Sequence, residues 1–314
     1  MPAPILIVAG PTASGKSALA LALAEEFAGT VINADSMQVY RDLRVLTARP
    51  GPEAEARAPH RLYGMIDAAE SCSAGRWKAL ALAEIAAASA AGRIPIITGG
   101  TGLYIHSLIH GLAPVPPIPE AIREDGRKLH AQIGSVRFHA LLADRDPAGA
   151  ARLAPGDTQR VLRAYEVVAA TGRPLGEWQR LSRTDALGKV AAVTLLPPRA
   201  ALYAACDARL VAMMQDGGVA EAEALLARQL PDDRPAMKAV GVREIGLWLS
   251  GRLGREEAIA AAQQATRRYA KRQYTWMRHR MAGLHGPTFE TQFSESLLPE
   301  IFAFIRQCLL TARN

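Results

Sequence analysis

"LIVAGPTASGKSALALALAEEF", residues 6–27, is the stretch that decides the fold. It holds the pattern G-x-x-x-x-G-K-[ST] between a short apolar run and a segment rich in leucine and alanine. Glycines let a backbone turn its N–H groups toward an anion, and a following helix offers that anion its positive end. Because a strand is expected before the pattern and a helix after it, a phosphate-binding loop is favoured over a chance glycine-rich turn.

The loop residues predict a ligand that contains a diphosphate and is bound with Mg²⁺. Lys16 can reach terminal phosphate oxygens, and the Ser17 hydroxyl can ligate the metal. The identity of the ligand stays open at this point. The residues expected to bind it are Gly10, Pro11, Thr12, Ala13, Ser14, Gly15, Lys16 and Ser17.

Strand and helix patterns alternate over the first 110 residues. Buried strands are predicted at 4–9, 30–34 and 93–98, because these are short apolar runs bounded by glycine or polar residues. A helix is predicted over 15–27, and a second one follows Ser73, which is expected to be its N-cap. The alternation is typical of a parallel α/β unit.

The pattern changes after residue 110, where four prolines fall within residues 111–124. Short, charged helices are expected next, then a helix over 157–172, a strand over 189–196, and only helix after Pro198. The predicted fold is α/β, a P-loop NTPase-like core with a parallel sheet, plus a helical insertion domain and C-terminal helices. The expected core covers 1–114 and 156–314, and the expected insertion covers 115–155.

Composition favours a globular chain with an anionic partner. Hydrophobic residues make up 49% of the 314 residues and charged residues 21%, which excludes a disordered chain. The formal net charge of +7 leans toward a polyanionic partner, although a solvated basic surface is the alternative. No apolar run is long enough to cross a bilayer, and the N-terminus has no basic leader. Three scattered cysteines without a CxxC, and seven histidines that do not cluster, favour a cytoplasmic protein without a zinc site.

An acidic residue is expected after a second buried strand if the loop binds a nucleotide and Mg²⁺. Asp35 fits this position, and Asp67 is a weaker candidate because its segment makes a poor strand. Asp35 also falls at the carboxyl end of a strand, where open α/β sheets bind ligands. From the residues alone, Asp35 is equally compatible with a magnesium ligand, a turn residue and a catalytic base.

Seven segments in order resemble the tRNA dimethylallyltransferase family. They are "GPTASGKS", "NADSMQVYR", "TARP", "PHRL", "GRIPIITGGTGLY", "DTQRVLRAYEV" and "RRYAKRQYTWMR", and the resemblance runs from about residue 5 to 280. It implies that the loop holds the diphosphate of dimethylallyl diphosphate, with Mg²⁺ at Ser17. The implied reaction transfers the dimethylallyl group to N6 of the adenosine 3′ of the anticodon, in tRNAs that read codons starting with U, and releases diphosphate.

The resemblance also assigns roles to individual side chains. Asp35 matches the family's catalytic base, a role typically worth ~10²–10⁴-fold in rate. Arg209 matches an arginine that reaches the diphosphate, whereas a nearby family arginine is Ala205 here. Thr101 matches a hydroxyl near the reacting groups, although a helix-capping role is the alternative. The implied catalytic residues are Asp35, Thr101, Lys16 and Arg209, and those implied to contact the target base are Asp35, Ser36, Met37, Gln38 and Thr101.

The target base must be flipped out of its stack to reach a buried carboxylate. Gln38 suits bidentate reading of an adenine edge. By resemblance, Arg123 and the residues Gln159, Arg160, Val161, Leu162 and Arg163 also contact the tRNA.

Three basic segments are expected to supply RNA phosphate contacts, "QRVLR", "MKAVGVRE" and "ATRRYAKRQYTWMRHR", and the last is the strongest on physical grounds. Residues 258–289 contain no acid, and their basic residues include like-charged i,i+4 pairs, which destabilise a helix without an anionic partner. A solvated basic face is the alternative. Tyr269, Tyr274 and Trp276 are expected in the core. The basic residues assigned to RNA are Lys238, Arg243, Arg267, Arg268, Lys271 and Arg272.

The expected partners are therefore a tRNA anticodon arm and dimethylallyl diphosphate, with no membrane, and the expected state is a monomer. Two other functions remain compatible with the residues. One is a P-loop kinase of a small metabolite, which would bind ATP tightly. The other is a non-catalytic RNA-binding protein that uses a nucleotide as a switch, in which Asp35 would not affect turnover.

Overall fold

The computed structural model describes residues 4–181, 187, 189–281 and 284–313. The chain divides into two compact units, one formed by Met1–Ser107 with Ala186–Asn314 and the other by Leu108–Asp185. No helix among the described residues has the length and apolar character that crossing a membrane requires.

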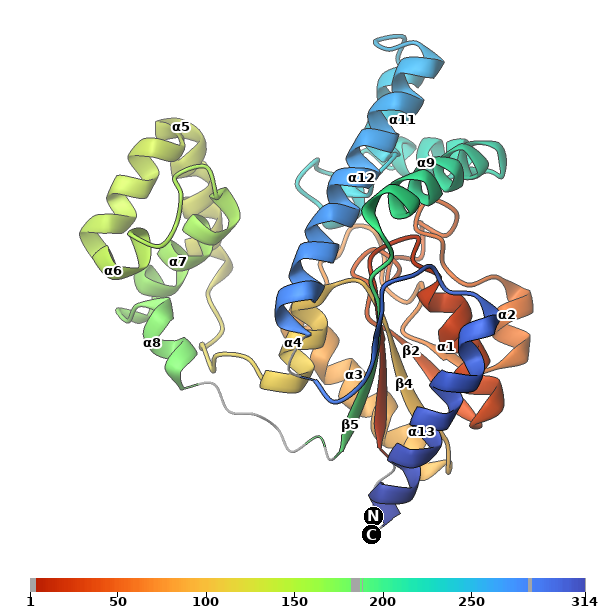
Figure 1. Cartoon of the computed structure of the whole chain (residues 1–314). Coiled ribbons are helices and arrows are strands. Elements are labelled where there is room, and N and C mark those ends of the chain that lie inside the picture. Colours follow the sequence, from red (N-terminus) through yellow and green to blue (C-terminus); the bar gives the residue numbers. More distant parts are fainter. Residues whose placement is uncertain (1–3, 182–186, 188, 282–283, 314) are drawn as a thin grey trace. The chain divides into compact units, whose positions relative to one another are not determined.

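The first unit is built on a six-stranded parallel sheet with the strand order β3-β2-β4-β1-β5-β6 (Figure 1). The four predicted strands are confirmed within one residue or two at each end, and nearly all of their residues are buried, as expected for a parallel sheet covered on both faces. The strands are β1 (Ile5–Ala9), β2 (Gly29–Asn33), β3 (His60–Arg61), β4 (Ile94–Gly99), β5 (Val190–Leu195) and β6 (Thr288–Phe289).

Two edge strands differ from the prediction. β6 lies beyond Pro198, where only helix was expected, so that expectation was wrong. Ala192 N donates to His285 O at 2.8 Å, and Leu196 N donates to Phe289 O at 2.8 Å. β3 and β6 have two residues each, which is too short for an alternating pattern, so only their pairing to the neighbouring strands defines them.

Helices cover both faces of the sheet (Figure 1). On one face, Leu19 and Leu23 pack with Ile301 and Ile305 in one buried cluster. On the other face lies helix α3, whose Trp77 Nε1 donates to Asn33 O at 2.7 Å. The helices of this unit are α1 (Lys16–Glu26), α2 (Pro52–Arg57), α3 (Ala74–Ala90), α4 (Gly102–His110), α9 (Arg199–Gln215), α10 (Gly218–Ala227), α11 (Val242–Leu249), α12 (Arg255–Arg280) and α13 (Leu298–Arg313), with the 3₁₀ turns η1 (Pro235–Lys238) and η2 (Glu295–Leu297).

Local signals fix several helix ends. The expected N-cap of α3 is confirmed, because Ser73 Oγ accepts from Arg76 N at 3.1 Å. Gly172 ends α7 (Thr158–Thr171) in a left-handed conformation, with φ of 66°, which glycine adopts without steric cost.

The second unit consists of α5 (Glu120–Arg145), α6 (Pro147–Ala150), α7 (Thr158–Thr171) and α8 (Leu175–Arg180). α5 has a non-helical residue, Gly134, in its middle. Phe138 and Leu142 of α5 pack against Val161 and Ala164 of α7. This unit covers Leu108–Asp185, whereas 115–155 was expected, and its part beyond 155 includes α7 because the apolar face of α7 is buried on α5.

Candidate active site

The phosphate loop connects the end of β1 to the start of α1 at the carboxyl edge of the sheet. Gly15 has φ of +88°, and a Cβ on it would lie 2.5 Å from the Cβ of Phe293, so glycine is required by both backbone and packing. Ala13 is also left-handed, with φ of 63°. That conformation costs an alanine about 1–2 kcal/mol, and such strain is common where a loop is shaped for a ligand.

The C-terminal helices hold the first part of the loop through Thr12. Thr12 N donates to Gln273 Oε1 at 2.7 Å, and the Arg209 guanidinium donates to Thr12 Oγ1. The Cys206 thiol lies 3.9 Å from Thr12 O as a weak donor. α9 and α12 therefore fix the backbone and side chain of a residue that lies 194 to 261 positions earlier in the chain.

A buried cation, Lys16, and a half-buried one, Arg209, lie at the loop. Lys16 is 9% exposed, and its Nζ donates to Pro11 O at 3.4 Å. Burial lowers the pKa of Lys16 to about 8, although the negative charge of Asp35 opposes the shift. Burial likewise lowers the pKa of Arg209. Neither cation forms an ion pair within the described part of the chain, and largely desolvated, unpaired cations indicate a site for an anion.

Asp35 follows β2 and is 8% exposed. Its Oδ1 accepts from Met37 N at 2.9 Å, so the carboxylate does form the turn that was one alternative. Asn33, which sequence reasoning missed, binds the backbone of Asp35 on both sides. Asn33 Oδ1 accepts from Asp35 N at 2.8 Å, and Asn33 Nδ2 donates to Asp35 O at 3.0 Å. The turn therefore orients the carboxylate, and Oδ2 has no hydrogen bond from a described residue.

Thr101 ties the loop after β4 to the loop after β2. Its Oγ1 accepts from Ser36 N at 2.9 Å and donates to Ser36 Oγ at 3.2 Å. Its carbonyl accepts from Tyr104 N at 3.0 Å at the start of α4. Thr101 thus begins the helix and also presents a hydroxyl beside the residue that follows Asp35.

These segments meet around a cavity of about 190 Å³. Tyr269 lines it, although it was expected to be an ordinary core residue. Its pKa is raised by burial first and then by the negative charge of Asp35. Tyr269 lies one turn of α12 before Gln273, so its place in the site follows from the packing of that helix on the two loops. Other residues around the cavity include Thr12, Asp35, Ser36, Met37 and Arg209.

Gln38 was expected to contact the target base, and in this structure its amide binds the backbone of a neighbouring loop. Its Nε2 donates to Thr47 O at 2.8 Å and to Ala48 O at 3.0 Å. Bidentate reading of an adenine needs both the donor and the acceptor of the amide. Because the donor is engaged here, Gln38 in this arrangement holds the loop that contributes Leu46 and Thr47 to the cavity.

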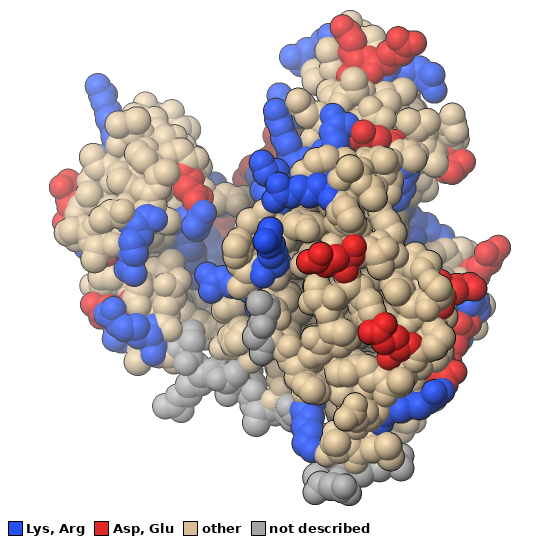
Figure 2. Space-filling model, in the orientation of Figure 1, with Lys and Arg blue, Asp and Glu red and all other residues tan. Residues whose placement is uncertain are grey.

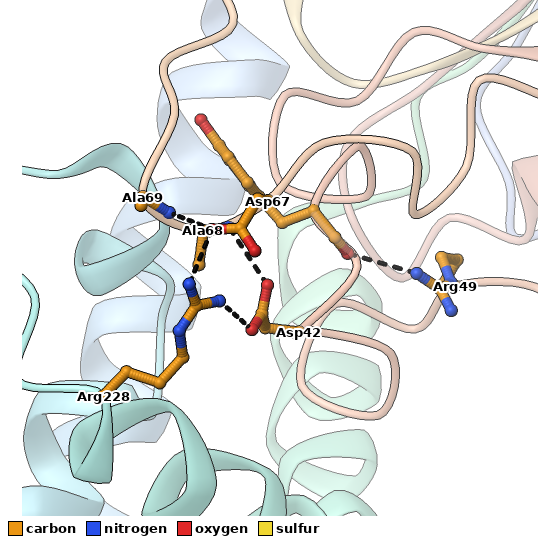
Figure 3. Close-up of polar contacts among 7 residues, drawn as sticks. Asp42, Arg49, Asp67, Ala68, Ala69 and Arg228 are labelled. Atoms are coloured by element: carbon orange, nitrogen blue, oxygen red, sulfur yellow. Dashed lines mark hydrogen bonds and ion pairs between the residues drawn. The ribbon is translucent and has the colours of Figure 1, made fainter.

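Polar contacts from α10 hold the same loop. The Glu221 carboxylate accepts from Val45 N at 2.9 Å and from Leu46 N at 2.8 Å. Arg228 forms ion pairs with Asp42 and, at 2.6 Å, with Asp67 (Figure 3). Asp67, the other candidate metal ligand, is thus engaged by Arg228.

A second hollow carries most of the expected basic residues of this unit. It is a groove of about 1200 Å³ between η1, α11 and α12, lined by Lys238, Arg243, Arg268 and Arg272 among others. Figure 2 shows Lys and Arg side chains along the surface over α12. Lys238 and Arg272 also line the smaller cavity, so the two hollows share a wall.

Lys271 is exposed on α12, but Arg267 differs from its neighbours. Its guanidinium donates to both carboxylate oxygens of Asp207 on α9, at 2.6 and 2.7 Å. The pair joins α9 to α12, so Arg267 stabilises the packing of these helices and does not line the groove.

The remaining expected RNA contacts belong to the second unit. Val161 is 1% exposed and packs in the core of that unit, whereas Gln159 and Arg160 are exposed. Arg160 pairs with Asp157 at 2.5 Å. Leu162 packs partly against the core, Arg163 pairs with Glu166 at 3.6 Å, and the Arg123 Nε is buried without a partner among the described residues.

The donor set suits a magnesium ion that is bound mainly through its ligand. The described residues contain no group of three or more His, Cys, Asp or Glu side chains that could hold a metal. Ser17 is exposed at the start of α1 and shares a small pocket with Thr98, whose buried hydroxyl has no partner among the described residues. Mg²⁺ keeps several waters and often uses phosphate oxygens, so hydroxyls beside a diphosphate fit it.

The parallel sheet, the phosphate loop and the buried carboxylate beside two cations define a P-loop protein built to act on a phosphorylated ligand. The chain belongs to the IPP transferase family, whose sequence model matches residues 38–280.

Similar proteins agree with this assignment. The tRNA dimethylallyltransferase of Rhodospirillum centenum is 57% identical over 286 residues, which is 90% of this chain and 91% of that one. The tRNA isopentenylpyrophosphate transferase of Bacillus halodurans has a TM-score of 0.71 and 31% identity, covering 99% of this chain and 98% of that one. A eukaryotic dimethylallyltransferase acting on tRNA has a TM-score of 0.82 over 97% of this chain and 80% of that one, and at 24% identity it supports the fold alone.

Proposed function

We propose that this chain transfers the dimethylallyl group of dimethylallyl diphosphate to N6 of the adenosine 3′ of the anticodon, in tRNAs that read codons starting with U. The observation that carries the proposal is that Asp35 lies near Lys16 and Arg209, one buried and one half-buried cation without ion-pair partners among the described residues. A cation pair suits a diphosphate, and a carboxylate beside it suits a nucleophile that must lose a proton.

Departure of the diphosphate requires stabilisation of the charge that develops on its bridging oxygen. As the C1–O bond breaks, the electron pair goes to the diphosphate, which the loop N–H groups, Lys16 and Arg209 hold. The loop is already shaped for this, because Thr12 is fixed from both α9 and α12. Ser17 would hold Mg²⁺, which would supply further charge neutralisation for the leaving group.

The adenine amino group is a weak nucleophile, because its lone pair is delocalised into the ring. As N6 bonds to C1 of the dimethylallyl group, it becomes positively charged and must lose a proton. The Oδ2 of Asp35 accepts that proton, while Oδ1 remains bonded to Met37 N and keeps the carboxylate oriented. The Thr101 hydroxyl holds Ser36, the residue after Asp35, and the Ser36 hydroxyl at the cavity binds the edge of the base.

The flipped adenosine enters the cavity from the basic groove. Lys238 and Arg272 line both hollows, so they bind the phosphates that flank the extruded base. Arg243, Arg268 and Lys271 extend the phosphate contacts along the groove. In the second unit, the exposed Gln159 and Arg160 contact the anticodon arm, as do Arg123 and Arg163.

A transfer assay tests this function. Purified protein is incubated with Mg²⁺, unmodified tRNA and radiolabelled dimethylallyl diphosphate, with ATP as a competitor in a parallel reaction. We expect label on the adenosine 3′ of the anticodon and no inhibition by ATP at an equal concentration. Absence of transfer, with tight ATP binding instead, would return the chain to the class of small-metabolite kinases.

A further inference from the structure

Gln273 of α12 occupies an unusual position for an amide side chain. It is 6% exposed, and its Oε1 accepts from Thr12 N across 261 residues of sequence. Its Nε2 is buried and has no hydrogen-bond partner among the described residues. Buried amide donors are nearly always paired, so an unpaired one at a ligand loop indicates a position retained for function.

The same amide presses against the loop that carries Thr101. A Cβ on Gly100 would lie 2.9 Å from Gln273 Cδ and would clash with Nε2. The φ of Gly100 is outside the left-handed region, so a side chain at this position would meet the Gln273 amide and would not strain the backbone. Gln273 is therefore wedged between the phosphate loop and the loop after β4.

In the proposed reaction, one of these loops binds the prenyl donor and the other supports the residues that act on the adenine. The phosphate loop holds the diphosphate, and Thr101 holds Ser36 beside Asp35. Gln273 has no exposed polar atom with which to touch a ligand, because its Nε2 is fully enclosed. It can act only through Thr12 and Gly100.

We propose that Gln273 is a positioning residue that sets the separation between the phosphate loop and the Thr101 loop. This inference rests on the proposed function for its effect on turnover, but its effect on the phosphate loop does not depend on prenyl transfer. Removing the acceptor leaves Thr12 N unpaired and lets the loop leave the conformation that binds diphosphate, which lowers the apparent affinity by the fraction of competent loop lost.

Gln273→Met is the first test, because methionine keeps the size and burial but removes the acceptor. We expect the dissociation constant for inorganic pyrophosphate with Mg²⁺ to rise about tenfold. The KM for tRNA should stay within about twofold, and kcat should fall. A side chain that served only the packing of α12 would lower the melting temperature without this selective loss.

Gln263→Met is the matched control on the same helix. Gln263 Nε2 donates to Asp207 O of α9 at 3.3 Å, so this variant also removes an amide contact between helices. It lies ten residues before Gln273, about 15 Å along the helix. Its pyrophosphate affinity should match that of the unchanged protein.

A double-mutant cycle tests the contact between Gln273 and Gly100. Gly100→Ala introduces the clash with Nε2 and should weaken pyrophosphate binding, whereas Gly100→Ala combined with Gln273→Ala should bind no more weakly than Gln273→Ala alone. Effects that simply multiply, or unchanged binding in Gln273→Met, would overturn the proposal. If Gln273→Met does not fold, the proposal is tested with Gly100→Ala alone. Unchanged pyrophosphate binding in that variant would refute the positioning role of Gln273. Weakened binding in a protein that transfers no prenyl group would refute the proposed function and leave the positioning role standing.

Discussion

At the scale of single residues, the chemistry depends on charges held in unusual environments. Lys16 is a buried amine whose pKa is lowered to about 8 by burial, against the opposing charge of Asp35. Such an amine is still mostly protonated at neutral pH, and a bound anion would raise its pKa again. The loop is therefore sensitive to pH just above neutrality.

Diphosphate affinity should consequently fall as the pH rises through 8. Binding to a partly deprotonated Lys16 takes up a proton, so the dissociation constant rises up to tenfold per pH unit between the free and bound pKa values. Calorimetric titration with pyrophosphate at pH 7, 8 and 9 measures this. Lys16→Arg is the control. Arginine stays charged over this pH range, so any pH dependence of its binding comes from the titration of pyrophosphate. Equal pH dependence in the two proteins would contradict the assignment.

Several residues of the site could be assigned only with the structure. Asp35, Lys16 and Ser17 follow from strand ends and the loop motif, which are local signals. Asn33 and Tyr269 gave no such signal, because each acts through a partner distant in sequence. The hydrogen bonds from the Gln38 amide to the backbone of Thr47 and Ala48 were also not predictable, because no local signal marks them.

At the scale of elements, α12 contributes residues both to the candidate active site and to the basic groove. Its inner face holds Gln273 and Tyr269 at the site, and its outer face carries Arg268 and Arg272 along the groove. The Arg272 guanidinium also lies 5.7 Å from the centre of the Tyr269 ring, which joins the two faces. The like-charge pairs of this helix are partly relieved by Asp207, which engages Arg267.

Two neighbouring arginines should therefore behave differently toward tRNA. Arg268→Gln removes a groove cation, and the slope of log affinity against log salt should become shallower by ~0.7–1. Arg267→Gln breaks the pair with Asp207, so its main effect should be on thermal stability, with the salt slope unchanged. Filter binding at four salt concentrations compares them. An equal change of slope in both would place Arg267 in the interface.

At the scale of the whole molecule, a segment near the C-terminus packs against the phosphate loop near the N-terminus. Phe293 N donates to Ser14 O at 3.2 Å, and its side chain packs against Gly15. Both this segment and the phosphate loop lie outside the residues 38–280 that match the family's sequence model. The central strands were predictable because they are apolar runs of five or six residues, but the two-residue β6 that leads into this segment was not.

Phe293→Ala should loosen the phosphate loop without touching the base side of the cavity. We expect the KM for dimethylallyl diphosphate to rise several-fold and the free energy of unfolding to fall by about 1–3 kcal/mol, as for a partly buried large side chain. Phe304→Ala, on α13 away from the loop, is the control for general loss of packing. Similar diphosphate kinetics in the two variants would show that Phe293 only packs.

The most direct measurement of the central claim is single-turnover transfer by Asp35→Asn. Asparagine keeps the acceptor for Met37 N but cannot take the proton from N6, so the geometry of the turn remains while the base is lost. We predict that the transfer rate falls by ~10²–10⁴-fold, while the affinities for tRNA and pyrophosphate stay within a few-fold. An unchanged transfer rate, or a loss explained entirely by weaker binding, would contradict the role of Asp35 as the base.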